Sequence, residues 1–120
     1  MDTINGRFTI HIDGKLVSND LGGDEPPIHA KLGSDPATFT LSNGVLECGD
    51  CYLGRWAIED RSLLPKRVYW FKKSQFDRHQ IQPTTAVPDG DSYQLRLGGL
   101  PLKARDGHVY VDMMEVKVEV

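Results

Sequence analysis

Apolar and polar residues alternate along most of this chain, and that alternation constrains its fold more than any other feature. In the segment "RFTIHID", Phe8, Ile10 and Ile12 fall on one face of an extended strand and polar residues fall on the other. The segment "MEVKVEV" at residues 114–120 repeats the pattern. No window of about eleven residues or longer carries the apolar stripe of a helix. The pattern predicts an all-β protein.

Turn dipeptides divide the chain into short strands. Asp13-Gly14 and Asn43-Gly44 favour tight type I′ turns, so each predicts a β-hairpin. Gly98-Gly99 and Asp106-Gly107 mark two further turns. We expect the other strands in "IHAKL", "CYLGRWAIED", "KRVYWFKK", "QIQP", "YQLRL", "LPLKA" and "HVYVD", and a loop at "TTAVPDGDS".

The expected fold is a single small antiparallel β-barrel or sandwich of about 10–12 short strands, with residues 1–120 as one domain. A β-trefoil is the alternative. The segments "FTIHIDGKLV", "FTLSNGVLEC" and "YQLRLGGLPLKA" resemble one another as an arm, a turn and a returning arm. Their first residues are 31 and 54 positions apart, whereas three equal repeats in this chain would each take about 40 residues. The uneven spacing favours the barrel or sandwich.

Charge and hydropathy exclude two classes of partner. The net charge is −3 and no basic run exceeds Lys72-Lys73, so the chain lacks the concentrated positive face that nucleic acid requires. The longest apolar runs are a few residues, too short to span a membrane. The N-terminal "MDTINGRFTI" has no apolar signal-peptide region. We expect no nucleic-acid and no membrane partner.

The two cysteines, Cys48 and Cys51, flank Gly49-Asp50 at a predicted hairpin tip. The residues that follow are strand-like, whereas a redox cysteine pair needs a helix N-terminus. The four histidines are scattered singly and supply no zinc-ligand spacing. We therefore expect plain thiols at a turn; a local disulfide, half of a metal site and a redox centre are the alternatives. No metal or cofactor is expected.

The aromatic run "VYWF" at residues 68–71, with aromatic residues on the preceding strand, is the best candidate for a ligand-binding surface. An exposed platform of such rings is the surface against which sugar rings stack. The alternative is that the rings fill the core. The candidate ligand-binding residues are Tyr52, Trp56, Tyr69 and Trp70.

Signals for catalysis are absent. No serine lies in a nucleophile elbow, and no glycine-rich phosphate loop precedes a helix. Glu59 and Asp60 are adjacent on a predicted strand, so they point to opposite faces and cannot form a carboxylate pair. The charges around them indicate a solvated surface. Whether the protein is an enzyme stays uncertain, and these observations favour a non-enzyme.

Four short motifs carry a resemblance to a known family: Asn43-Gly44-Val45-Leu46, Gly54-Arg55 with Ala57-Ile58, Leu97-Gly98-Gly99 and Val109-Tyr110-Val111-Asp112. Together they resemble the small β-domain of ascomycete fungal cell-wall proteins, the Pir-type C-terminal domain and related hyphal wall proteins. That family usually has a cysteine in the arm after "LGG", where this chain has Pro101-Leu102-Lys103-Ala104. The resemblance implies an extracellular or cell-surface module without catalytic activity. Without it, the lack of a signal peptide favours the cytoplasm.

Three functions follow as hypotheses. The first is a secreted or surface β-module that binds glycan or a protein partner. The second is a small β-barrel enzyme of the cyclase or isomerase type, which acts on an apolar molecule by positioning alone. The third is a trefoil-type protease inhibitor, in which an exposed loop such as "LGGDEPP" at residues 21–27 enters a protease cleft. A ligand-sized cavity would favour the second hypothesis, and inhibition of a protease the third.

Overall fold

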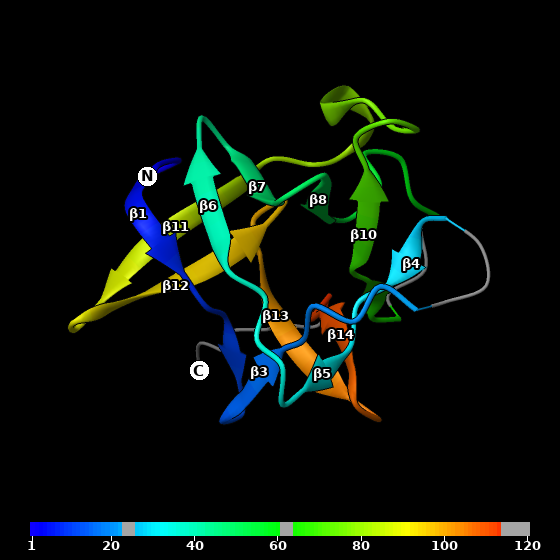
Figure 1. Ribbon diagram of the computed structural model, residues 1–120. Coiled ribbons are helices and arrows are strands. Elements are labelled where there is room, and N and C mark those ends of the chain that lie inside the picture. The colour runs from blue at the N-terminus through cyan, green and yellow to red at the C-terminus, as the bar shows by residue number, and fades with distance from the viewer. Residues whose placement is uncertain (23–25, 61–63, 114–120) are drawn as a thin grey trace, which may run out of the picture.

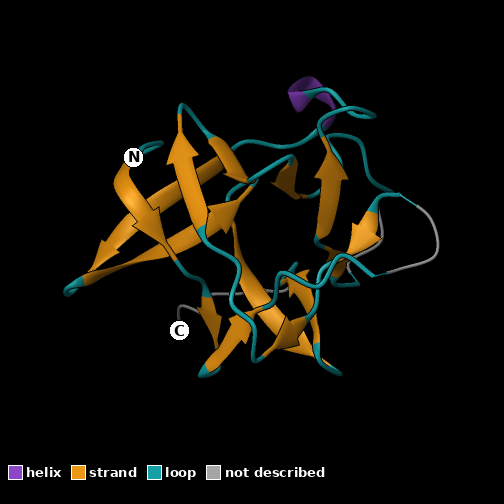
Figure 2. Ribbon diagram, in the orientation of Figure 1, coloured by secondary structure: helices purple, strands orange, loops and turns teal. Residues whose placement is uncertain are grey.

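The computed structural model describes residues 1–22, 26–60 and 64–113, which form mainly short β-strands (Figure 2). This part of the chain holds fourteen strands and one 3-10 turn, η1 (Arg78–Gln80). The strands are β1 (Ile4–Phe8), β2 (His11–Ile12), β3 (Lys15–Val17), β4 (Ile28–His29), β5 (Leu32–Gly33), β6 (Phe39–Ser42), β7 (Val45–Cys48), β8 (Cys51–Gly54), β9 (Lys66–Arg67), β10 (Tyr69–Lys72), β11 (Thr84–Asp89), β12 (Ser92–Leu97), β13 (Leu100–Arg105) and β14 (His108–Val111). The all-β prediction is confirmed.

Hydrogen bonds group these strands into three antiparallel sheets (Figure 1). The largest has the order β1-β6-β7-β8-β10-β4, the second β11-β12-β13-β14-β9 and the third β2-β3-β5. The β11–β12 hairpin extends from one side of the molecule, and β4 and β10 lie on the other (Figure 1). The described strands do not join into one closed barrel, so packed sheets of the sandwich type describe the arrangement better.

Three hairpin turns form as their dipeptides predict. In each, an Asp or Asn with positive φ precedes a glycine with positive φ, the combination that a type I′ turn requires. The pairs are Asp13-Gly14 (52° and 78°), Asn43-Gly44 (52° and 79°) and Asp106-Gly107 (53° and 75°). Sequence and local geometry agree most closely at these turns.

Strand boundaries differ from the prediction in three segments. "TTAVPDGDS" contains strand β11 instead of a loop, because Thr84 and Ala86 are buried while their neighbours are exposed. "CYLGRWAIED" is a strand only as far as Gly54. "QIQP" contributes one isolated bridge, between Ile81 and Trp56. The strand predicted at 114–120 lies outside the described residues.

Three fully buried residues, Ala30, Val68 and Val109, form a closed ring of backbone hydrogen bonds. The Ala30 amide donates to the Val68 carbonyl (2.9 Å), the Val68 amide to the Val109 carbonyl (3.0 Å), and the Val109 amide to the Ala30 carbonyl (3.0 Å). A buried amide without a partner is costly, so each residue depends on the next. The ring joins three chain segments that are remote in sequence.

The three strand pairs around this ring are related in the same way to the ring residues. The residue after one ring position pairs with the residue before another: Tyr69 with His29, Tyr110 with Arg67, and Lys31 with His108. From Ala30 to Val68 is 38 residues, and from Val68 to Val109 is 41. An approximate threefold axis therefore passes through the ring, with a period close to one third of the chain. The described residues thus combine sheets packed in the sandwich manner with the threefold relation that the β-trefoil alternative requires.

The hydrophobic core is continuous across the three sheets. At its centre the rings of Phe39 and Trp70 stack with centroids 5.5 Å apart, and both residues are buried. Stacked aromatic pairs contribute beyond their buried area. Other fully buried members are Leu41, Leu46, Leu53, Leu97, Val17 and Val111.

The ring makes a prediction for amide exchange. Its three amides are hydrogen-bonded, fully buried and shared between distant segments, so they should open only with global unfolding. In hydrogen–deuterium exchange followed by NMR, Ala30, Val68 and Val109 should belong to the slowest class. Lys15, an exposed residue next to the turn of the β2–β3 hairpin, serves as the internal comparison. Ring amides that exchange as fast as Lys15 would contradict this account.

Candidate functional site

Two long loops occupy equivalent positions around the threefold axis. Residues 18–27 join β3 to β4 and lead to Ala30, and residues 55–65 join β8 to β9 and lead to Val68. The third equivalent connection, from β13 to β14, is only the turn Asp106-Gly107. The scaffold therefore carries two insertions in places where a tight turn suffices. Residues 23–25 and 61–63 of these loops lie outside the described residues.

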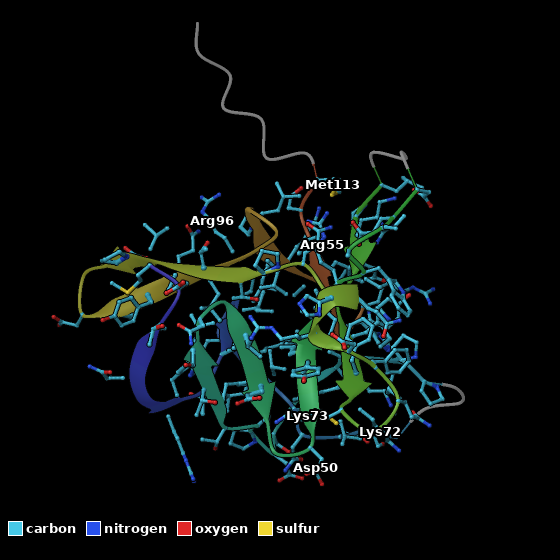
Figure 3. The ribbon with its side chains drawn as sticks, turned by 90° about the horizontal axis from the view of Figure 1, so that it is seen from above. Asp50, Arg55, Lys72, Lys73, Arg96 and Met113 are labelled. Atoms are coloured by element: carbon cyan, nitrogen blue, oxygen red, sulfur yellow. The ribbon has the colours of Figure 1, made fainter. Side chains whose placement is uncertain are left out.

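A buried arginine fixes the start of the β8–β9 loop. Arg55 is 5% exposed, and Figure 3 shows it well separated from Asp50, Lys72 and Lys73, which lie at the opposite edge of the view. Its Nε and Nη2 donate to Glu59 Oε1 at 3.0 and 2.6 Å, and its Nη1 donates to the Leu97 carbonyl at 3.1 Å. Charge-assisted bonds of this kind are among the strongest in proteins.

Backbone contacts hold the same loop against the segment that follows η1. The Ala57 amide donates to the Gln80 carbonyl (2.7 Å), and the Gln82 amide donates to the Arg55 carbonyl (3.0 Å). The Gln82 side chain also donates to the Trp56 carbonyl (3.0 Å). The β8–β9 loop and the segment after η1 approach each other closely at Gly54, where any side chain would collide with Ile81. Residues 55–57 are thus anchored in the scaffold.

The loop presents an apolar side chain to solvent. Ile58 is 91% exposed, between the anchored Ala57 and the ion-paired Glu59, and Leu64 near the other end of the loop is 71% exposed. The carboxylate of Asp60 contacts the ammonium group of Lys66, which is buried at the start of β9. Ion pairs therefore hold Glu59 and Asp60, the two described residues that follow Ile58.

The β3–β4 loop is anchored differently. Lys31 donates to the Gly22 carbonyl (2.7 Å) and lies 3.7 Å from the Asp20 carboxylate. The Gly22 amide donates to Asp20 Oδ1 (2.8 Å), which closes a local turn. Leu21, between them, is 38% exposed. This anchor lies at the surface, where charge pairs contribute little.

The four aromatic residues predicted to bind a ligand do not form one surface. Trp70 is 1% exposed in the core, and its indole N–H has no partner among the described residues. Trp56 and Tyr69 lie together, 6.4 Å between ring centroids, and Trp56 also packs edge-on against Phe71 at 4.9 Å. Tyr52 is half-buried beneath the ammonium of Lys73. Ligand binding by these residues stays a prediction.

Two surface cavities accompany this arrangement, of about 490 and 720 Å³. Tyr52 lines the smaller cavity, together with Arg78 and Gln82. Neither cavity is lined by Trp56, Tyr69 or Trp70. The predicted aromatic residues and the hollow parts of the surface are therefore largely separate.

Cys48 and Cys51 pair across the β7–β8 hairpin, as the sequence predicts, and both are free. Cys51 is 3% exposed, and burial raises the pKa of its thiol. A raised pKa keeps the thiol protonated and unreactive, so this residue lacks the thiolate character of a redox centre.

The side chain of His29 contacts the backbone ring directly. Its Nε2–H donates to the Val109 carbonyl at 2.9 Å, so that oxygen accepts bonds from both His29 and Val68. Its imidazole stacks on His108 with centroids 4.7 Å apart and meets Tyr110 edge-on at 4.9 Å. Burial lowers the pKa of His29, against the opposing effect of the Val109 bond, and the charges of His108 and Arg67 lower it further.

A family model described as Peptidase inhibitor I66 matches residues 35–120. The match covers more than half of the chain, which therefore belongs to this family. It includes the whole β8–β9 loop and most of the strands. No curated protein and no solved structure matches the chain.

The resemblance to fungal cell-wall domains is therefore wrong. It depended on four short motifs that consist largely of turn residues, and such motifs recur wherever β-strands reverse direction. The extracellular location does not depend on that resemblance alone, because membership in a peptidase-inhibitor family is compatible with it. Among the described residues, no helix is long and apolar enough to cross a membrane.

Sequence reasoning missed Arg55, Glu59 and Ile58. The segment was predicted as a strand and its charges as a solvated surface, but the side chains of Arg55 and Glu59 are only 6% and 11% exposed. Position 55 is buried because the Leu97 carbonyl and the loop itself cover it. One sequence feature could have predicted a loop here. Gly54 and Pro65, residue types that often end strands, lie on either side of residues 55–64.

The Arg55–Glu59 pair makes a prediction for stability. Glu59→Ala leaves a buried guanidinium without its carboxylate and should lower the free energy of unfolding by about 2–4 kcal/mol. The double variant Arg55→Met/Glu59→Leu removes both charges and should lie within about 1 kcal/mol of the parent. Urea unfolding measures both. A single and a double variant of equal stability would show that the pair is not buried in solution.

His29 makes a prediction for pH dependence. Because its folded-state pKa is lowered, the unfolded chain binds a proton more readily, so stability is complete above the ordinary value of 6.5 and falls as pH drops through it. Urea unfolding between pH 7.5 and 5.5 should show this loss, and His29→Gln should reduce the slope. His11→Gln, at an exposed histidine that does not contribute to the pKa of His29, is the matched comparison. An unchanged slope in His29→Gln would contradict the assignment.

Proposed function

We propose that this protein inhibits a peptidase by placing an exposed loop in the substrate cleft of the enzyme. Membership in the Peptidase inhibitor I66 family is the observation that carries this proposal. It favours the inhibitor hypothesis over the glycan-binding module and over the small β-barrel enzyme. The partner is accordingly a protein, the peptidase.

The scaffold supports this function physically. Binding a flexible loop costs conformational entropy, and a loop already held in one conformation avoids most of that cost. The described parts of both long loops are anchored, one through Arg55 and the other through Lys31. An anchored, exposed loop binds a cleft as a substrate does, but the scaffold resists the rearrangement that cleavage and release require. Inhibition of this kind needs no catalytic group in the inhibitor.

Of the two loops, the sequence pointed to residues 21–27 and the structure favours residues 55–65. The β8–β9 loop has the buried anchor and the more exposed apolar side chain, Ile58 compared with Leu21. Buried charge-assisted bonds hold geometry better than surface pairs do. We therefore place the peptidase contact at the β8–β9 loop.

Inhibition assays test the proposed function. The purified protein is titrated, up to about 10 µM, into peptidases that use serine, cysteine, aspartate or a metal ion. We expect at least one to be inhibited competitively with a small substrate, while mass spectrometry shows the 120-residue chain intact. Heat-denatured protein is the control. No inhibition in any of the four classes would contradict the proposal.

A further inference from the structure

We propose that Ile58 is the side chain that enters the substrate pocket, and that the target is a peptidase whose pocket accepts a branched aliphatic side chain. This inference rests on the proposed function and adds the contact residue and the substrate preference of the target. It follows from three properties of the described part of the β8–β9 loop: exposure, anchoring and charge.

Exposure distinguishes Ile58 from the other apolar residues. At 91% it is the most exposed large hydrophobic residue among those described, ahead of Leu64 at 71% and Met1 at 56%. A single exposed apolar residue is common on protein surfaces. Ile58 is unusual because the chain on both sides of it is fixed.

Anchoring holds Ile58 from both directions. On one side the Ala57 amide donates to the Gln80 carbonyl at 2.7 Å. On the other, Glu59 accepts two bonds from the buried guanidinium of Arg55. The backbone at residue 58 is thus presented on a rigid support, and a β-branched side chain has few rotamers to lose. Contact residues with these properties contribute strongly to binding.

Charge indicates the kind of pocket. The nearest carboxylate, that of Glu59, is neutralised by Arg55, and Asp60 contacts Lys66. The group that projects is therefore an uncharged hydrocarbon. A pocket lined by apolar side chains gains from burying it, whereas a pocket with a buried acid, suited to Lys or Arg, would have that acid left unpaired. The geometry therefore favours a peptidase that recognises aliphatic side chains.

The test compares substitutions at Ile58 across peptidases of different preference. Inhibition constants are measured against peptidases that cleave beside aliphatic, aromatic and basic side chains. The parent protein should inhibit the aliphatic-preferring enzyme best. Ile58→Ala should raise that constant about 10-fold or more, and Ile58→Asp at least about 100-fold, because a carboxylate would be buried without a partner. Ile58→Arg should move the preference toward the basic-specific enzyme.

Val87→Asp is the matched control. Val87 is also an exposed aliphatic residue, at 44%, but it lies on β11, away from the side of β4 and β10 (Figure 1). Its substitution should change the inhibition constant by no more than about twofold. Because Ile58 is exposed, its variants should keep the melting temperature of the parent, which separates loss of contact from loss of fold.

Several results would overturn the inference while leaving the proposed function intact. One is a parent protein that inhibits only the basic-specific peptidase, which would indicate recognition of Arg61 instead. Another is an unchanged inhibition constant in Ile58→Asp together with a large increase in Leu21→Asp. Absence of inhibition by the parent protein would overturn both the proposed function and this inference.

Discussion

The ring of three backbone hydrogen bonds among Ala30, Val68 and Val109 is the constraint on which the rest of the structure depends. A buried amide must find an acceptor, and each of these three finds it in another third of the chain. The ring fixes the register of the three strand pairs that lie beside it. Short strands that would be marginal alone are thereby held together.

The ring also explains where the loops lie. Each strand that reaches a ring position is preceded by a connection, and two of those three connections are long. A rigid centre with anchored loops at its edge suits a binding protein, because the loops vary without disturbing the core. Family membership and the anchored Ile58 support our proposal that this arrangement inhibits a peptidase.

The sequence predicted what depends on local patterns. Alternation and the Asp-Gly and Asn-Gly dipeptides predicted the all-β class and three hairpin turns correctly. The threefold relation was obscured, because the hairpins are unevenly spaced and only the ring residues keep a period of 38 and 41. A local sequence pattern could not predict the Arg55 anchor either, because the burial of Arg55 depends on Leu97, 42 residues away in the chain. The alternation in "YLGRWAI" predicted a strand where tertiary contacts impose a loop.

The most direct measurement is hydrogen–deuterium exchange of the protein alone and in complex with the peptidase that it inhibits. Amides that the enzyme covers should exchange more slowly in the complex. This account predicts that the new protection is concentrated at residues 55–60, around Ile58. Protection concentrated at residues 18–22 or on the β11–β12 hairpin, with residues 55–60 unchanged, would contradict it.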